Sequence, residues 1–219
     1  MSPPRILVIN PNSSQAVTQA IDDALLPLRL PDGPRIEVQG MASGPRGIAT
    51  QSDADSVIGP LQALVRAETA DAFVIACFSD PGLYAVREAA GGRLVMGIAE
   101  CGLLRALTLG ESFGIIALAV SSIRRQQRYV RLIGLQQRYA GSWPIAAVAE
   151  ESAQGETFGR LREAGARLCQ DKGADVIVLG CAGMASHRRR LEDALGVPVV
   201  EPTQAAVTAA LGAVLLGRA

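Results

Sequence analysis

The sequence predicts an α/β fold of two pseudo-symmetric domains, each a roughly four-stranded parallel sheet flanked by helices. Three observations predict it. Apolar runs without alternation indicate strands that are buried on both faces. Helical segments lie between those runs, and the second half repeats the order of the first. The 219 residues are 49% hydrophobic and 19% charged, enough for one substantial core or two small ones.

The expected strands fall into two sets of four. Those of the first half occupy residues 5–10, 35–40, 72–78 and 93–99. Those of the second half occupy residues 113–119, 145–150, 175–181 and 197–202. Segments with one apolar stripe predict helices between and after them, at 14–28, 54–68, 82–91, 103–110, 122–134, 157–173, 187–196 and 203–217.

Two stretches align across the halves. "ADAFVIAC" (70–77) matches "ADVIVLGC" (174–181), which places Cys77 and Cys181 at equivalent positions. "VMGIAE" (95–100) matches "VPVVEP" (197–202), which places Glu100 opposite Glu201. We interpret the alignment as an internal duplication.

Composition excludes several classes of function. Acidic and basic residues number 21 each, so no net charge favours nucleic acid or a membrane surface. No window approaches the ~18 apolar residues of a membrane span, and the run around residues 6–9 is too short for a signal peptide. We therefore expect a cytoplasmic protein with reduced cysteines. One histidine and no CxxC spacing make a zinc site unexpected.

Cys77 and Cys181 each end an expected strand, just before a turn into a helix. Ligands of open parallel sheets bind beyond the carboxyl ends of the strands, so facing halves would place the two sulfurs on opposite walls of one cleft. Backbone N–H groups and helix dipoles there are expected to lower the pKa of both thiols. Racemisation requires two acid/base groups on opposite sides of a carbon, one to remove a proton from one face and one to donate a proton to the other. The planar enolate formed between these steps carries negative charge, which N–H donors stabilise.

A cysteine in an apolar strand is usually a small buried hydrophobe, and this is the structural alternative. The equivalent positions of Cys77 and Cys181 favour a function over that alternative. Cys101 and Cys169 are interpreted as structural. Cys101 opens a helix without a visible partner, and Cys169 lies on an apolar helix stripe.

The chain resembles the Asp/Glu/hydantoin racemase superfamily, nearest the hydantoin and allantoin racemase branch. The resemblance lies in "INPNSS" (9–14), "ACFSDPGL" (76–83) and "VLGCAGM" (178–184), with "GIAE" (97–100) in support. It implies a cofactor-independent racemase with Cys77 and Cys181 as the acid/base pair in the cleft between two domains. It also implies that helix 203–217 crosses back, so that residues 1–99 with 203–217 form the first domain and 100–202 the second.

The same resemblance implies a set of substrate-binding residues: Asn10 and Ser13 at the end of the first strand, and the backbone amides of Phe78, Ser79, Ala182 and Gly183. A turn and helix N-cap is the structural alternative for "NPNSS", and both roles can hold at once. Asp80 is interpreted mainly as a cap for the helix that follows it.

Some positions depart from the patterns of the family. Glutamate racemases carry a Thr-His pair where Ala182 and Gly183 stand. The hydantoin branch usually has Thr-Thr in place of Ala117 and Leu118, and tends to have Asp-Gly in place of Glu201 and Pro202. With no cationic side chain visible beside either cysteine, a neutral ring such as a hydantoin is favoured over free aspartate or glutamate.

Other functions were weighed against racemisation. A PLP-dependent racemase needs a Schiff-base lysine, and the sole lysine, Lys172, is expected at an exposed helix end, so no cofactor is expected. A cysteine hydrolase needs a base beside its nucleophile, whereas His187 is expected to face solvent. A maleate-type isomerase, a decarboxylase and a non-catalytic small-molecule binding protein stay open as alternatives. The identity of the small-molecule substrate and homo-oligomer formation are also left open.

Overall fold

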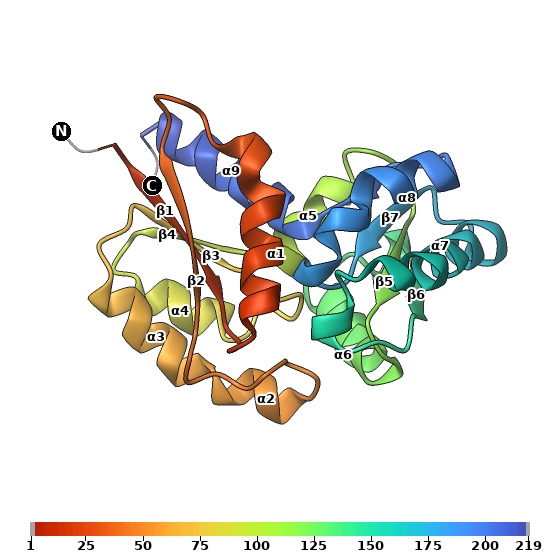
Figure 1. The fold of residues 1–219 in the computed structure, drawn as a ribbon, viewed down its shortest axis with the longest axis horizontal. Helices are drawn as coiled ribbons and strands as arrows, with labels where there is room; N and C mark the ends of the chain where they lie inside the picture. Colours follow the sequence, from red (N-terminus) through yellow and green to blue (C-terminus); the bar gives the residue numbers. More distant parts are fainter. Residues whose placement is uncertain (1–2, 218–219) are drawn as a thin grey trace.

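Two four-stranded parallel sheets stand side by side, each flanked by helices (Figure 1), in the computed structural model, which describes residues 3–217. The first sheet has the order β2-β1-β3-β4 and the second β6-β5-β7-β8, so the topology of the first half is repeated in the second. The strands are β1 (Arg5–Asn10), β2 (Arg35–Gly40), β3 (Ala72–Ile75), β4 (Leu94–Gly97), β5 (Phe113–Ala117), β6 (Tyr139–Pro144), β7 (Val176–Leu179) and β8 (Val199–Val200). The predicted fold class is confirmed.

The helices cover the faces of the two sheets. They are α1 (Gln15–Leu25), α2 (Gln51–Ser56), α3 (Ile58–Ala67), α4 (Leu83–Ala89), α5 (Ile98–Ala106), α6 (Val120–Leu132), α7 (Phe158–Lys172), α8 (Arg188–Leu195) and α9 (Pro202–Leu215). Short 3-10 turns lie at Leu26–Leu28, Gln136–Arg138, Ala149–Glu151, Gly155–Thr157 and Ala182–His187. None of the helices between residues 3 and 217 has the length and apolar character needed to cross a membrane.

The strand expected at 145–150 is wrong. The structure places β6 at Tyr139–Pro144, where it pairs with β5 alone at the edge of the second sheet. All six residues of β6 are only partly buried, so this strand lacks the continuous apolar run that marks a central parallel strand. The run at 145–150 is instead a loop, in which Ala146 has a φ of 51° and a 3-10 turn begins at Ala149.

Two helix boundaries also differ from expectation. The helix expected at 54–68 is divided at Val57 into α2 and α3. Pro60 lies in the first turn of α3, where its missing N–H leaves no hydrogen bond unmade. Helix α5 begins at Ile98, five residues before the expected 103, because a carboxylate from another loop caps its first turn.

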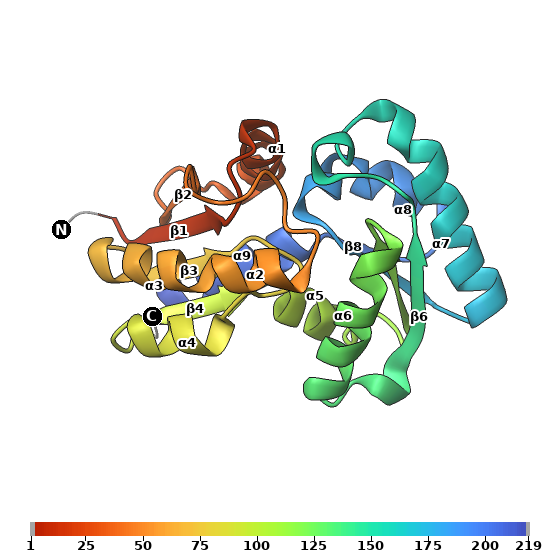
Figure 2. The same ribbon diagram turned by 90° about the horizontal axis from the view of Figure 1, so that it is seen from below.

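Helices α5 and α9 join the halves (Figure 2). Ile98 and Cys101 of α5 pack into a core with α1, α9 and the first sheet. Leu103 and Ala106 of the same helix pack against β5 and β7 of the second sheet. Helix α9 follows the last strand of the second sheet, yet it packs against β1, β3 and β4 of the first. Because α5 buries side chains against both sheets, the halves share an apolar contact.

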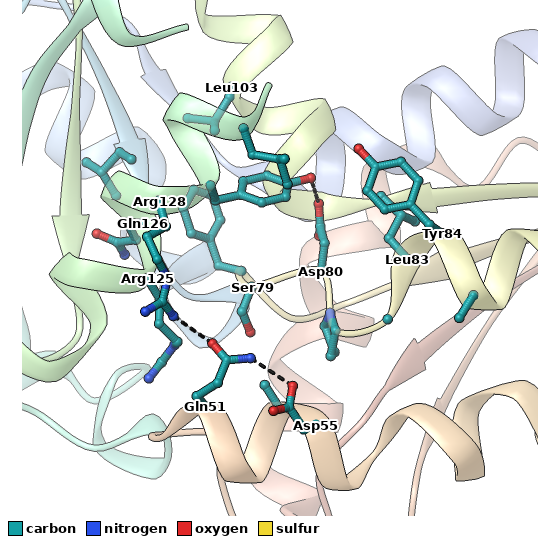
Figure 3. A pocket seen from close by; sticks show the side chains of 18 residues that line it. Gln51, Asp55, Ser79, Asp80, Leu83, Tyr84, Leu103, Arg125, Gln126 and Arg128 are labelled. Carbon is teal, nitrogen blue, oxygen red and sulfur yellow. Dashed lines mark hydrogen bonds between the residues drawn. The ribbon is translucent and has the colours of Figure 1, made fainter. Parts of the chain in front are cut away.

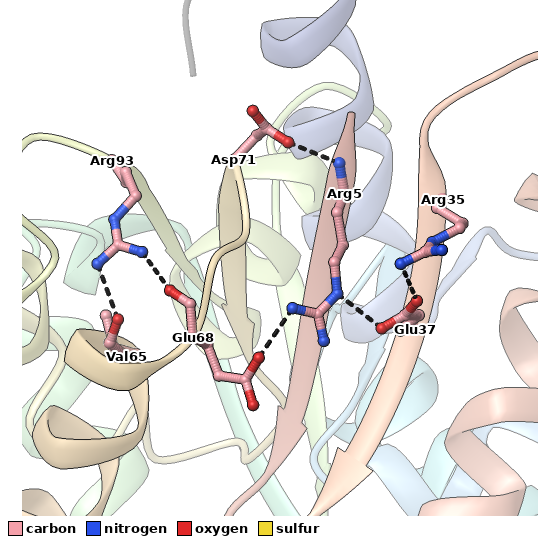
Figure 4. Close-up of polar contacts among 7 residues, drawn as sticks. All are labelled: Arg5, Arg35, Glu37, Val65, Glu68, Asp71 and Arg93. Atoms are coloured by element: carbon pink, nitrogen blue, oxygen red, sulfur yellow. Dashed lines mark hydrogen bonds and ion pairs between the residues drawn. The ribbon is translucent and has the colours of Figure 1, made fainter. Parts of the chain in front are cut away.

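A polar network holds the amino-terminal edge of the first sheet (Figure 4). Arg5 donates from Nε to Glu37 at 2.6 Å and from Nη1 to Glu68 at 2.8 Å, while its backbone N–H donates to Asp71 at 2.7 Å. In the second half Asp175 accepts the backbone N–H groups just before β5, at 2.9 and 2.8 Å. These contacts lie at the end of each sheet opposite to the carboxyl ends of its strands.

Candidate active site

The two cysteines meet at the carboxyl ends of the sheets. Strand β3 ends two residues before Cys77, and β7 ends two residues before Cys181. Both thiols are free, and both line one cavity of about 60 Å3 between the halves. The expectation that these two side chains face a common space is therefore met.

The surroundings of the two sulfurs are similar. The Sγ of Cys77 lies 3.1 Å from the hydroxyl of Ser79, and the Sγ of Cys181 lies 3.9 Å from the hydroxyl of Ser152. The backbone N–H groups of Ser79 and Gly183, each two residues after a cysteine, act to lower the pKa of the adjacent thiol. Each sulfur thus has one hydroxyl and one amide directed toward it.

The expected lowering of the thiol pKa values is wrong, because burial outweighs those donors. Burial raises the pKa of Cys77 to about 11, and it also raises the pKa of Cys181. Negative charge at Cys181 raises the pKa of Cys77 further. Burial therefore favours the protonated form of both thiols, and a thiolate at Cys181 disfavours a second thiolate at Cys77.

The other sequence-predicted site residues divide into two groups. Phe78, Ser79 and Ala182 line the cysteine cavity. Asn10, Ser13 and Gly183 do not line it, although the backbone amide of Gly183 interacts with the thiol of Cys181. The buried side chain of Asn10 donates to the Oδ1 of Asn12 at 3.1 Å, and it is Asn12 that lines the cavity. The backbone N–H of Ser13 donates to a carbonyl of the loop after β2, at 2.9 Å.

Helix α6 supplies residues that sequence reasoning missed. Ser122, Arg125 and Gln126 line the cysteine cavity. Arg125 also corrects the expectation that no cationic side chain lies beside the cysteines. A signal was available: α6 follows β5, and the first turns of a helix after a parallel strand face the ligand side of the sheet. The polar stretch "SSIRRQQ" occupies those turns.

His187 does not face solvent as expected. It is only 6% exposed, and its Nε2 lies 3.1 Å from the carbonyl oxygen of Ser152. It ends the 3-10 turn that follows Cys181 and so precedes the exposed arginines of α8. Burial lowers the pKa of its imidazole. Because Ser152 contacts Cys181, His187 helps to position the hydroxyl beside that thiol.

Asp80 caps a different helix from the one expected. Its carboxylate accepts the backbone N–H groups of Ala99 and Glu100 at 2.9 and 2.8 Å, which are in the first turn of α5. It also accepts the hydroxyl of Tyr129 at 2.8 Å. Helix α4, which follows Asp80 in sequence, begins at Leu83, and its N-cap residue Gly82 offers no side-chain cap. The cap therefore ties the loop after Cys77 to α5.

The alignment of Glu100 with Glu201 is also wrong. Glu201 is the N-cap of α9, and the N-cap at the corresponding position of α5 is Gly97. Glu100 lies inside α5 and forms an ion pair with Arg87 at 2.5 Å. The equivalent of Glu201 in the first half is therefore three residues before Glu100.

The remaining candidates keep structural roles. Cys101 is buried with its sulfur 3.8 Å from that of Met96. Cys169 is partly buried and packs against a hydrophobic cluster of the second half. Lys172 is exposed at the last position of α7, before the left-handed cap Gly173. Across residues 3–217, no three His, Cys, Asp or Glu side chains gather closely enough to hold a metal ion.

Comparison with known proteins identifies the family of this chain. The family model described as Asp/Glu/Hydantoin racemase matches residues 6–210. The hydantoin racemase of Paenarthrobacter aurescens is 36% identical over 97% of this chain and 92% of its own. That of Rhizobium meliloti is 36% identical over 92% of this chain and 85% of its own. The allantoin racemase structure from Klebsiella pneumoniae has a TM-score of 0.90 at 32% identity, covering 99% of this chain and 89% of that one.

The chain belongs to the Asp/Glu/hydantoin racemase family. It is accordingly an enzyme of the isomerase class that acts on a small molecule. A structure of arylmalonate decarboxylase has a TM-score of 0.70 at 21% identity, which shows a shared fold alone.

Proposed function

We propose that this enzyme is a cofactor-independent racemase of a small hydantoin- or allantoin-like amino-acid derivative, with Cys77 and Cys181 as its acid/base pair. One observation carries the proposal: both free thiols line a single cavity of about 60 Å3 from equivalent loops of the two halves. The similarity to hydantoin and allantoin racemases supports the substrate class.

Racemisation at C5 of a hydantoin needs a base on one face of the ring and an acid on the other. In the proposed reaction, the thiolate of one cysteine removes the C5 proton, and the electron pair moves onto the adjacent carbonyl oxygen. The thiol of the other cysteine then donates its proton to the opposite face of C5. The protonation states of the two cysteines are exchanged at the end, so the same site serves the reverse reaction.

The electrostatics of the cavity suit this exchange. A buried thiolate with a raised pKa binds a proton more strongly, which helps it to remove a weakly acidic C–H. The side-chain amides of Asn12 and Gln126 line the same cavity and offer N–H donors for the enolate oxygen. The proposal uses no cofactor, and Lys172 lies at the exposed end of α7 rather than in the cavity.

The deciding experiment is exchange of the C5 proton in D2O. Each enantiomer of 5-methylhydantoin and of allantoin is incubated with enzyme, and NMR follows deuterium while circular dichroism follows racemisation. Cys77→Ser and Cys181→Ser should each slow racemisation by about a hundredfold to ten-thousandfold, because serine is too weak an acid/base. Each should still exchange one enantiomer with retention, and the two should select opposite enantiomers. Cys169→Ser, outside the cavity, is the matched control.

The alternatives give different results. A one-cysteine reaction leaves one of the two serine variants nearly normal. A decarboxylase releases CO2 from a substituted malonate, and a binding protein exchanges no substrate in the wild type. If both serine variants exchange the same enantiomer, the two-cysteine proposal is wrong.

A further inference from the structure

A second and larger cavity adjoins the cysteine cavity. It has a volume of about 610 Å3, and Phe78, Ser79, Arg125 and Gln126 line both cavities. Figure 3 shows it between helix α6 and the loop that carries Ser79 and Asp80. A planar ring bound at the cysteines would therefore have space beside it for a substituent.

The larger cavity combines apolar walls with positive charge. Apolar side chains from both halves line it, among them Leu83, Leu103 and Ile115. Arg125 and Arg128 are the two cationic side chains in its lining (Figure 3). Neither guanidinium forms an ion pair within residues 3–217. The chemistry of this wall fits a short aliphatic substituent that ends in an anion.

Arg125 has hydrogen-bonding capacity that the protein does not use. Its Nη1 donates to the carbonyl of Ala49 at 2.5 Å, but its Nε is buried without a hydrogen-bond partner. A buried donor without a partner is destabilising, as is a charge that burial removes from water. Burial lowers the pKa of Arg125, and the charge of Arg128 acts in the same direction. A bound anion would relieve both penalties.

The acidic side chains nearby are already engaged. Asp80 accepts two backbone N–H groups of α5 and the hydroxyl of Tyr129. Asp55 accepts from the amide of Gln51 at 2.8 Å. Asp53 accepts two backbone N–H groups at the start of α2. None of these carboxylates forms an ion pair with Arg125, so its guanidinium stays available to an anion of the substrate.

We propose that Arg125 binds a carboxylate on the C5 substituent of the substrate, so that the enzyme acts preferentially on hydantoins of acidic amino acids. The hydantoin ring lies between Cys77 and Cys181, and the carboxyalkyl group extends into the larger cavity. This assignment rests on the proposed function, because that function places C5 between the two sulfurs. Planar guanidinium and carboxylate groups pair through two parallel hydrogen bonds, which gives selectivity by geometry as well as by charge.

The test compares an acid with its uncharged isostere. Hydantoin-5-acetate and hydantoin-5-acetamide are used, with Kd from calorimetry and kcat/KM for racemisation from circular dichroism. Wild type should favour the acetate by about tenfold to a hundredfold, the usual range for a charge-assisted hydrogen bond. Arg125→Gln should bring the ratio close to one, and Arg125→Lys should leave an intermediate ratio because it keeps the charge without the planar fork. Arg124→Gln changes the exposed neighbour on α6 and should keep the wild-type ratio.

The outcomes separate this assignment from the proposed function. Racemisation of 5-methylhydantoin with no preference for the acetate, in both Kd and kcat/KM, overturns the role of Arg125 and leaves the proposed function standing. Binding of the acetate that depends on Arg125, without racemisation of any hydantoin, supports the anion site and overturns the proposed function. Loss of the preference in Arg124→Gln as well as in Arg125→Gln would mean that the net charge of α6 causes it, and would overturn the assignment.

Discussion

Helices α5 and α9 follow equivalent strands in the two halves, and a carboxylate caps the first turn of each. Glu201 is the N-cap residue of α9, and its oxygens accept the N–H groups two and three residues further on. In the first half Gly97 is the N-cap residue, and Asp80 accepts the N–H groups two and three residues after it. In the first half, the two hydrogen bonds that Glu201 makes in α9 are thus made by Asp80, which lies 17 positions before the N-cap residue Gly97.

The difference shows how the two cysteine loops are fixed. Asp80 lies three residues after Cys77, with a φ of 41°, so its cap holds the loop of that cysteine against α5. The loop of Cys181 is held instead by Ser152 and His187. Gly97 is required in the first half, because a Cβ at that position would lie 2.3 Å from the carboxyl carbon of Asp80.

The largest expected effect comes from removing the two capping carboxylates. Asp80→Ala leaves two N–H groups and the Tyr129 hydroxyl without their acceptor and should lower the free energy of unfolding by about 3–4 kcal/mol. Glu201→Ala removes the acceptor of two N–H groups and should lower it by about 2 kcal/mol. Urea unfolding measures both. Equal losses would contradict the idea that Asp80 carries the additional contact.

A rescue experiment sharpens the same comparison. Gly97→Asp in the Asp80→Ala background places a carboxylate where the second half has its own, and the clash at Gly97 is gone. The double variant should recover about 1–2 kcal/mol of the free energy of unfolding, the usual value of an N-cap. Gly97→Asp alone should be destabilising. If the double variant is no more stable than Asp80→Ala, the two caps are not interchangeable.

The next effect is on the pH dependence of stability. Burial raises the pKa of Asp80 from its usual 3.8 to about 6, so the folded state binds more protons than the unfolded state between these values. The contribution of Asp80 to stability is therefore full below pH 4 and falls as the pH rises through 6. Asp80→Asn cannot titrate, so its loss of stability between pH 4 and 7 should be smaller than that of wild type by about 2 kcal/mol. The other carboxylates contribute equally to variant and wild type, so the difference between the two reports Asp80 alone. If the free energy of unfolding of Asp80→Asn changed with pH as steeply as that of wild type, the raised pKa of Asp80 would be contradicted.

A smaller effect is expected at the serines beside the sulfurs. The hydroxyl of Ser79 lies 3.1 Å from Cys77, whereas that of Ser152 lies 3.9 Å from Cys181. Both hydroxyls lower the pKa of the adjacent thiol. Ser79→Ala should slow proton exchange at neutral pH by about tenfold and Ser152→Ala by about threefold, since a normal hydrogen bond contributes about 1 kcal/mol. The pH profile of exchange should move to higher pH in both. If the pH profile moved further in Ser152→Ala than in Ser79→Ala, the idea that the shorter contact has the larger effect would be wrong.

Local patterns explain what the sequence could predict. The central strands are continuous apolar runs, and the equivalence of Cys77 and Cys181 follows from the alignment of the eight residues that end at each cysteine, four of which are identical. The edge strand β6 has no such run, because one of its edges and part of its faces are exposed. Arg125, His187 and Asp80 act through contacts with residues distant in sequence, which periodicity does not encode. The assignment of residues 1–99 with 203–217 to the first domain, and of 100–202 to the second, stays a prediction.

The smallest expected effect concerns the opposite edge of the sheets, where the halves again differ. Arg5 at the start of β1 forms partly buried ion pairs with Glu37 and Glu68, whereas at the start of β5 the ring of Phe113 packs on that of Tyr139, with centroids 5.7 Å apart. Arg5→Gln should lower the free energy of unfolding by about 1 kcal/mol at low salt, and by less than half of that in ~1 M NaCl, where charges are screened. Phe113→Leu should cost about 1 kcal/mol at both salt concentrations, because its contribution is packing. Urea unfolding at the two salt concentrations measures this, and proton exchange at the cysteines should be unchanged in both variants. A loss in Arg5→Gln that does not depend on salt would mean that the aliphatic stem of Arg5, rather than its charge, stabilises this edge.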